Sequence, residues 1–415
     1  MNSGYRFGDE IRREWRVLVA TIMGMSCAIA TLGLPYSIGV MIEPLRREFG
    51  WTLAEIMGVA PIVAVSVVLM SAFVGYWVDR RSARPLIVAS HIGFGSSMLA
   101  LGLLTHSLWS YYGIYCIAAL LGGGMLAVSY MKMVVPRFDR ERGLAVGISL
   151  IGSGLSSFLY QPQLVRIVDH WGWRAGYLSI GLLILLVALP VALAWARDPP
   201  RAMAAAGAKI PAEQPPGTSL GEALRSYRFW VLFAIFFLFS GGLTGVLTNF
   251  VAILTELGYS RSAAGDTAGM VFGLSLILGR IVIGLLLDRT WAPLVGCVFF
   301  LASAAGIALL GQPGFGSGSH KVFIALCGLA AGAEVDLMAY LVSRYFGVRA
   351  LGKIYGGVYI AFALGPGPLV PVFGWLRDTT GSYQTGLLWV GVSLGCAGLL
   401  LLSLGPYPAA FRPRH

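Results

Sequence analysis

The chain contains twelve apolar runs, each long enough to form a helix that crosses a lipid bilayer, and this repetition limits the possible folds more than any other feature. A soluble domain of this size would have to bury all of these runs, yet only 12% of the residues are charged, against roughly 25% in soluble domains. The runs are continuous rather than alternating, which favours helices over a β-barrel. We therefore expect an all-α integral membrane protein.

The twelve predicted spans are arranged as six on each side of a polar stretch. This stretch, residues 197–228, is rich in proline, alanine and charge and is typical of a linker. It predicts an N-terminal six-helix bundle over residues 1–196, a cytoplasmic linker over 197–228 and a C-terminal six-helix bundle over 229–415. The predicted spans are 17–43, 54–78, 85–105, 108–132, 143–165, 175–196, 229–255, 266–287, 291–311, 321–343, 353–376 and 385–404.

Basic residues predict the orientation of these spans. With both termini in the cytoplasm, 21 of the 30 lysine and arginine residues fall on the cytoplasmic side, 7 fall on the opposite side, and Lys132 and Arg280 lie within spans. This is the positive-inside bias of a plasma membrane protein, which in a bacterium means the inner membrane. The net charge of +11 is scattered over short loops, so we expect a lipid bilayer and no nucleic acid as partner.

The two halves also repeat in sequence. Three loop residues after the second span recur 209 positions later, after the eighth span. The first set is Gly75, Asp79 and Arg80, and the second is Gly284, Asp288 and Arg289. Two parallel six-helix repeats around a central linker are typical of secondary transporters.

The stretch "GYWVDRRSAR" resembles the loop motif of the major facilitator superfamily, and the resemblance covers essentially the whole chain. Gly75, Asp79, Arg80 and Arg84 match the motif, whereas Ser82 or Ala83 stands where a second glycine is usual. The resemblance implies a twelve-helix major facilitator fold. It also implies that this loop, and its second copy with Gly284, Asp288 and Arg289, take part in gating, although arginines in such loops also serve to set topology.

Three longer stretches are similar to the monocarboxylate transporter group and, more loosely, to oxalate–formate exchangers: "GLPYSIGVMIEPLRREFGW", "GAEVDLMAYLVSRYFGVRALGKIYGG" and "GWLRDTTGSY". The resemblance implies a small carboxylate substrate that is held by the arginine of the eighth span, here Arg280. Tyr36 and Leu276 stand where animal members carry a lysine and an aspartate tied to proton coupling. These departures leave the coupling ion open.

Arg280 lies eight residues before Asp288, which is ~12 Å along a helix and well inside a hydrocarbon core of ~30 Å. An arginine at that depth costs roughly 2.5–3.5 kcal/mol and needs a partner or a watered cavity. One explanation is a carboxylate substrate, because the planar guanidinium binds carboxylates with two parallel hydrogen bonds. The other is a structural ion pair with Glu334 or Asp336 of the tenth span.

Glu334 and Asp336 are the two carboxylates well inside an apolar span. Two residues on a helix differ by roughly 200°, so these side chains face different ways and do not form a carboxylate pair. Each is a candidate proton carrier, and Glu334, the deeper one, is preferred. The alternative is hydrogen bonding to neighbouring helices.

Polar residues along the spans are candidates for lining a substrate cavity, although such residues also serve as contacts between helices. Tyr36 and Tyr359 rank first, since the first and eleventh spans line the pathway in the superfamily that the chain resembles. The full candidate set is Arg280, Tyr36, Tyr359, Tyr115, Asn249, Gln161 and Thr248.

These features predict a secondary active transporter for a small organic anion, with proton symport as the default and carboxylate exchange as the main alternative. A drug exporter and a carboxylate sensor without transport rank below these two. No nucleotide-binding loop and no cysteine or histidine set with metal-ligand spacing is present in the sequence. We therefore expect no enzyme activity, no cofactor and no metal, and a chain that works as a monomer.

Overall fold

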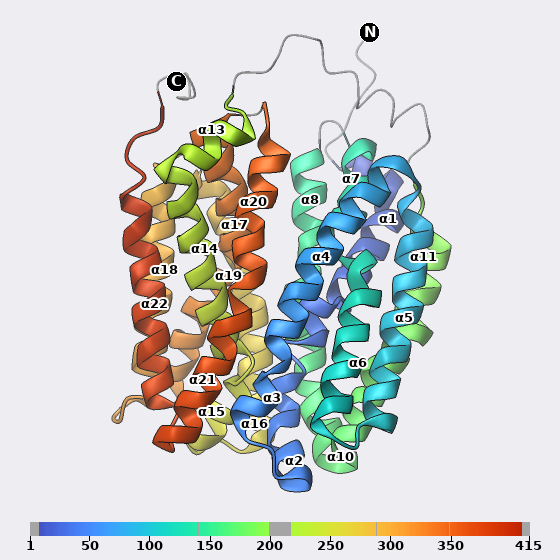
Figure 1. Ribbon diagram of the computed structural model, residues 1–415, viewed down its shortest axis with the longest axis vertical. Coiled ribbons are helices and arrows are strands. Elements are labelled where there is room, and N and C mark those ends of the chain that lie inside the picture. Colours follow the sequence, from blue (N-terminus) through green and yellow to red (C-terminus); the bar gives the residue numbers. More distant parts are fainter. Residues whose placement is uncertain (1–7, 139–140, 199–216, 288, 348, 409–415) are drawn as a thin grey trace. The chain divides into compact units, whose positions relative to one another are not determined.

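The computed structural model describes residues 8–138, 141–198, 217–287, 289–347 and 349–408, and over these residues the protein is all-α without a β-strand. Eleven helical stretches in this part of the chain are long and apolar enough to cross a membrane. The long helices of each half lie side by side (Figure 1). Of the predicted linker 197–228, residues 199–216 lie outside the described residues.

One of the eleven stretches contains two predicted spans. It runs over Leu144–Trp195, 52 residues, which as a straight helix would be roughly 78 Å long, more than twice the thickness of the hydrocarbon core. Gly172 interrupts it with φ 82° and ψ 170°, a conformation that glycine adopts without a steric penalty. The chain therefore turns between the predicted fifth and sixth spans, and the eleven stretches accommodate all twelve.

The first span is interrupted where the sequence predicted one apolar run over 17–43. Helix α1 (Asp9–Ser26) is followed by the π-helical turn η1 (Ile29–Gly33) and by α2 (Ile38–Phe49). At the break the Thr31 hydroxyl lies within hydrogen-bonding distance, 2.8–3.1 Å, of three backbone carbonyls. Such a side chain satisfies backbone groups that the interrupted helix leaves open.

The chain divides into two compact units. Unit 1 comprises residues 1–44 and 66–211, and unit 2 comprises residues 45–65 and 212–415. Helix α4 (Val59–Arg80) and helix α2 cross the boundaries of the short segment 45–65. The remaining elements of unit 1 are α5 (Ala83–Leu104), α6 (Leu108–Leu121), η2 (Gly122–Met125), α7 (Ala127–Val134), η3 (Val135–Arg137), α8 (Arg142–Leu150), α9 (Gly152–Leu155), η4 (Ser156–Tyr160), α10 (Gln161–Leu183), η5 (Ile184–Ala188) and α11 (Leu189–Trp195).

Unit 2 holds the helices that carry Arg280 and the two carboxylates Glu334 and Asp336. Its elements are α3 (Leu53–Met57), α13 (Leu220–Arg225), α14 (Tyr227–Leu247), α15 (Phe250–Glu256), α16 (Arg261–Asp266), η6 (Thr267–Val271), α17 (Phe272–Leu287), α18 (Ala292–Leu310), α19 (Ser317–Phe346), α20 (Leu351–Leu364), α21 (Pro366–Thr380) and α22 (Gln384–Leu402). Helix α17 packs on α19, and α18 packs on α19 and α22. Helix α14 packs on α20, α21 and α22, and α3 packs on α21.

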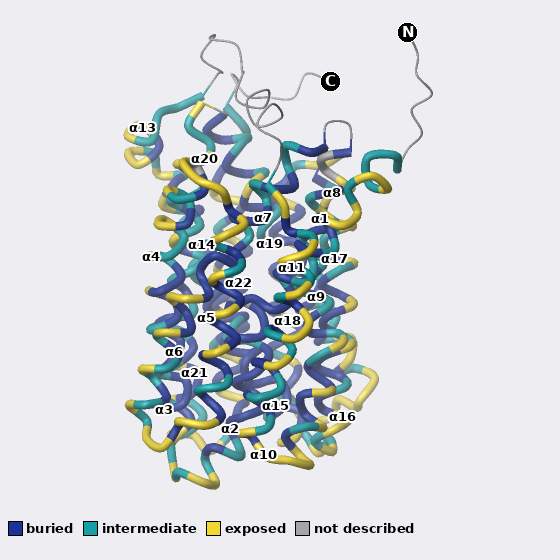
Figure 2. The backbone as a smooth tube through the Cα atoms, turned by 90° about the vertical axis from the view of Figure 1, so that its right-hand side faces the viewer, coloured by how far each residue is buried: buried dark blue, intermediate teal, exposed yellow. Residues whose placement is uncertain are grey.

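Large apolar side chains are exposed along these helices, as expected for surfaces that face lipid. The exposed turns, yellow in Figure 2, alternate with buried ones along single helices. Trp109, Leu186, Leu285 and Val392 are all more than half exposed. A soluble monomer rarely leaves so much apolar surface in water, so the exposed side chains agree with a protein that crosses the bilayer several times.

Candidate functional site

Arg280 lies in the middle of α17 and is the one charged residue among Phe272–Leu287. Its side chain is only 11% exposed, and its Nη1 atom lies 3.6 Å from Oδ2 of Asp336 on α19. Neither Nε nor Nη1 of Arg280 has a hydrogen-bond partner among the described residues. The guanidinium is thus nearly buried and has an ionic partner, but its hydrogen-bonding capacity is not used up.

Three glycines bring α17 and α19 close enough for this pair. A Cβ atom added to Gly332 would lie 2.1 Å from the carbonyl oxygen of Leu276, and one added to Gly279 would lie 2.3 Å from that of Leu329. A Cβ at Gly328 would likewise lie 2.6 Å from a backbone oxygen of α17. Small residues at a crossing let two membrane helices touch through their backbones. Because Arg280 follows Gly279, and the two carboxylates follow Gly332, the crossing places the cation beside the acids.

Both carboxylates interact with Arg280, although they point in different directions from α19. Asp336 forms the ion pair, and its side chain is 34% exposed. Glu334 interacts electrostatically with Arg280, and its Oε2 atom is buried without a hydrogen-bond partner in the described chain. The ion-pair alternative that the sequence left open is therefore present in the structure, with Asp336 as the partner. The long arginine side chain explains how one cation interacts with two acids that are far apart around their own helix.

Two tyrosines of α20 complete this group. Tyr355 interacts electrostatically with Asp336 and Arg280, and Tyr359 does so with Glu334. The two rings are stacked with centroids 6.1 Å apart. Side chains from α17, α19 and α20 thus form one group, which we call the Arg280 cluster: Arg280, Glu334, Asp336, Tyr355 and Tyr359. The sequence gives Tyr359 as a candidate substrate ligand, and Tyr355 lies four residues before it in the same polar stripe.

Thr248 and Asn249, at the end of α14, are engaged elsewhere in unit 2. The Thr248 hydroxyl donates to the carbonyl of Thr244 at 2.8 Å. The Asn249 side chain donates to the carbonyl of Gly245 at 2.8 Å and accepts from the Tyr383 hydroxyl at 3.3 Å. Both residues are fully buried, and these hydrogen bonds connect α14 to Tyr383 rather than to the Arg280 cluster.

The three candidates of unit 1 are buried in that unit. The Tyr115 hydroxyl lies 3.2 Å from that of Tyr177, and Gln161 accepts a hydrogen bond from Ser157 at 3.1 Å. Tyr36 lies between η1 and α2 and is 5% exposed. These contacts place each residue in the packing of unit 1, and its role toward a substrate stays a prediction.

The structure describes most residues of the two loop motifs that follow the second and eighth predicted spans. Arg80 lies over the ring of Tyr76 at 3.8 Å, and Arg84 donates to the carbonyl of Leu193 at 2.7 Å. A Cβ at Gly75 or Gly284 would meet nothing within 4 Å. Arg289 is exposed. The side chain of Asp79 and the whole of Asp288 lie outside the described residues.

Sequence reasoning missed an acidic contact beside the first motif. Asp198, at the start of the predicted linker, accepts from the backbone N–H of Ala83 at 2.9 Å and from the Ser82 hydroxyl. The carboxylate therefore lies at the N-terminus of α5, where the helix dipole favours a negative charge. Ser82 in the N-cap position was the signal that a helix begins there, but nothing in the sequence pointed to an acceptor 115 residues away.

Comparison with known proteins shows which family and which solved structures the chain is similar to. The family model of the Major Facilitator Superfamily matches residues 17–369. Monocarboxylate transporter 11 of Homo sapiens is 27% identical over 393 residues, covering 88% of this chain and 79% of that protein. Monocarboxylate transporter 13 of Bos taurus is 26% identical over 400 residues, covering 94% and 89%. The crystal structure of a bacterial homologue of the human lysosomal transporter Spinster, inward-facing and occupied, aligns with a TM-score of 0.72 at 16% identity, covering 96% of this chain and 97% of that one.

Proposed function

Because the chain belongs to the Major Facilitator Superfamily, we propose that it is a secondary transporter that carries a small monocarboxylate and binds it through Arg280. It is a multi-pass membrane protein and a transporter rather than an enzyme. The observation that carries the proposal is the nearly buried Arg280, which has two nitrogen atoms without a hydrogen-bond partner in the described chain. The monocarboxylate transporters among its relatives support the choice of substrate class.

Asp336 acts in this proposal as the resident counterion of Arg280. An ion pair of 3.6 Å is longer than the 2.7–2.9 Å typical of a charge-assisted hydrogen bond, so it neutralises the cation without using its donors. A substrate carboxylate that accepts two parallel N–H bonds satisfies the guanidinium better. The substrate therefore binds by competing with Asp336, and the exposed third of the Asp336 side chain offers the incoming anion access to the pair.

Glu334 is the proposed proton carrier. Its Oε2 atom is buried without a hydrogen-bond partner in the described chain, and an unsatisfied buried oxygen costs less on a neutral carboxyl than on a charged one. Tyr359 interacts with it and supplies a hydroxyl near the acid. Proton entry at Glu334 lowers the negative charge around Arg280, which favours entry of an anionic substrate at the same site. This order of events describes proton symport.

The transport cycle proposed here is alternating access between two six-helix halves, residues 1–196 and 229–415, joined by a cytoplasmic linker over 197–228. Tyr36, Tyr115 and Gln161 of the first half are proposed to complete the substrate site, and the loop residues Gly75, Asp79, Arg80 and Arg84, with Gly284, Asp288 and Arg289, to gate the cytoplasmic side. Both termini lie in the cytoplasm, and the chain works as a monomer.

Anion exchange is the second candidate function, and one position favours it. Leu276, one turn before Arg280, is buried and apolar, so α17 itself brings no proton-binding group to the site. An exchanger needs none, because each carboxylate that leaves is replaced by another.

Uptake into proteoliposomes tests the proposal. We expect accumulation of radiolabelled lactate or an aromatic monocarboxylate, driven by an inward proton gradient, and loss of most of this uptake in Arg280→Lys, which keeps the charge but not the planar fork. Arg225→Lys, on exposed α13, is the matched control and keeps parent uptake. Normal uptake in Arg280→Lys contradicts the assignment. Stimulation by internal carboxylate, with no response to the proton gradient, identifies an exchanger.

A further inference from the structure

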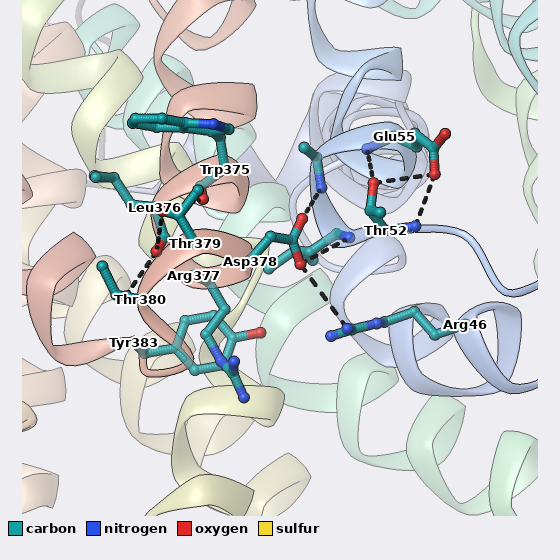
Figure 3. A network of polar contacts seen from close by, with 12 residues as sticks. Arg46, Thr52, Glu55, Trp375, Leu376, Arg377, Asp378, Thr379, Thr380 and Tyr383 are labelled. Carbon is teal, nitrogen blue, oxygen red and sulfur yellow. Dashed lines mark hydrogen bonds and ion pairs between the residues drawn. The ribbon is translucent and has the colours of Figure 1, made fainter.

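The carboxylate of Asp378, near the end of α21, joins that helix to the short segment 45–65 of the same unit (Figure 3). It accepts backbone hydrogen bonds from Leu53 at 3.3 Å and from Ala54 at 2.8 Å. Its Oδ1 atom also lies 3.8 Å from Nη2 of Arg46. One side chain therefore contacts the first turn of α3 and a cation just before it. The resemblance drawn from "GWLRDTTGSY" gave this aspartate no role.

Segment 45–65 has an unusual place in the chain. It is joined to residues 44 and 66 of unit 1, yet it packs with unit 2. Leu53, Ile56 and Met57 are fully buried, so α3 is firmly seated. If the two halves of the chain move against each other during transport, the covalent links at residues 44 and 66 pull this segment along with unit 1, although it packs on unit 2.

One face of α21 forms the surface that receives the segment. A Cβ at Gly374 would lie 3.2–3.3 Å from backbone atoms of Leu53 and Ala54, so the absence of a side chain there lets α3 pack closely on α21. Further along, a Cβ at Gly367 would lie 3.5 Å from that of Ala64. Gly367, Gly374 and Asp378 are spaced by seven and four residues, which places them on one face of the helix. Asp378 is the charged residue at the C-terminal end of this face.

The neighbouring residue, Arg377, is directed to a different partner. Its Nη2 atom lies 3.0 Å from Oε2 of Glu256, at the end of α15. Glu256 also accepts from the backbone of Tyr383 and from the Ser382 hydroxyl, both at 3.1 Å. All of these residues lie in the C-terminal half, so this ion pair has no reason to break when the two halves move. It is therefore an internal control for the contact made by Asp378.

We propose that Asp378 is a latch that holds segment 45–65 on α21 while one end of the transport path is closed, and releases it when that end opens. In the topology predicted from the basic residues, this is the end opposite the cytoplasm. The three contacts suit such a role because they are short-range and lie near the end of the helix, where water can replace each of them once the helices separate. The inference goes beyond the choice of substrate and needs only that the two halves move.

Cysteine labelling tests the latch without any transport measurement. Ala54→Cys, in a background where the exposed Cys396 is replaced by alanine, is treated with a membrane-impermeant maleimide. We expect Asp378→Asn to raise the labelling rate about tenfold, which corresponds to about 1.4 kcal/mol of lost latch stability, and Glu256→Gln to leave the rate unchanged. Labelling of Asp378→Asn at the parent rate, or an equal rise in Glu256→Gln, overturns the proposal.

A reversible crosslink gives a second test that leaves Asp378 in place. The separation of 3.5 Å between the Cβ positions of residues 64 and 367 is within the range for a disulfide. Oxidised Ala64→Cys/Gly367→Cys is expected to lose transport and to recover it on reduction, while each single variant is insensitive to oxidant. Full transport by the crosslinked protein means that the segment does not need to leave α21. If the parent transports no carboxylate, the proposed function fails, and the labelling result still decides on the latch.

Discussion

The glycine crossing between α17 and α19 leads to the prediction that Gly332→Ala impairs transport although it adds only one uncharged methyl group. The added carbon would lie 2.1 Å from the Leu276 carbonyl oxygen and 3.0 Å from the backbone nitrogen of Arg280. Ordinary van der Waals contact begins at 3.4 Å, so the helices must separate locally by about 1.3 Å. Both nearest atoms belong to the backbone of α17, which has no rotamer change with which to yield.

The separation has a structural and a functional consequence. Overpacking of this kind costs about 1–3 kcal/mol, which lowers the thermal midpoint of the purified protein. Displacing Arg280 by about 1 Å from the acids of α19 also takes the ion pair, now 3.6 Å, past the roughly 4 Å limit of such pairs. A misplacement of about 1 Å in a binding constellation can cost about 100-fold in rate. We therefore expect initial uptake to fall by about 10- to 100-fold.

The assay compares initial uptake rates in proteoliposomes with thermal unfolding in detergent. Gly318→Ala, also on α19, is the matched control, because a Cβ there meets nothing within 4 Å and alanine favours a helix over glycine. It is expected to keep parent uptake and stability. If Gly332→Ala also transports at the parent rate with an unchanged midpoint, the backbone contact between α17 and α19 does not position Arg280, and the reasoning is refuted.

Three further predictions concern charged residues. Asp336→Asn removes the resident counterion that competes with the substrate, so the apparent KM for the carboxylate falls. Net transport slows, because Arg280 without substrate then reorients as an unpaired charge. A raised KM contradicts this role. Glu334→Gln abolishes the response of uptake to an inward proton gradient but spares counterflow exchange, and accumulation driven as in the parent shows that Glu334 is not the proton carrier. Asp79→Asn shifts cysteine accessibility at the two mouths of the path more than Asp288→Asn, since the loop of Asp79 has the fuller motif; unchanged labelling in both means that these loops only set topology.

The sequence predicted the number and order of the spans because hydropathy reports the membrane directly, and a single charge in an apolar run stands out against it. Arg280 was identifiable for that reason. Hydropathy did not reveal the break after α1, because the residues around Ile29–Gly33 are as apolar as those of a straight helix. Pro35, which has no backbone N–H, was the sequence signal that could have indicated it. Backbone hydrogen bonding inside a membrane helix leaves no trace in hydropathy.

The composition of the Arg280 cluster was predictable only in part. The rotation of about 200° between Glu334 and Asp336 indicates that they do not form a pair, but it does not show that one long side chain interacts with both. That depends on which helix α19 crosses, and at what height. Polar residues such as Asn249 pose a similar problem, because an amide that lines a cavity and an amide that bonds Gly245 and Tyr383 look the same in sequence.

The contact between α3 and α21 also determines when segment 45–65 can reach its final position during synthesis of the chain. Ala54 and Asp378 are 324 residues apart, so at about 5–20 residues per second the ribosome needs roughly 16–65 s to make the partner after the first contact residue has emerged. Throughout that interval the backbone N–H groups of Leu53 and Ala54 lack the Asp378 carboxylate that accepts from them. The early chain must therefore satisfy these groups with other acceptors, and the segment takes its final place only when α21 has been made.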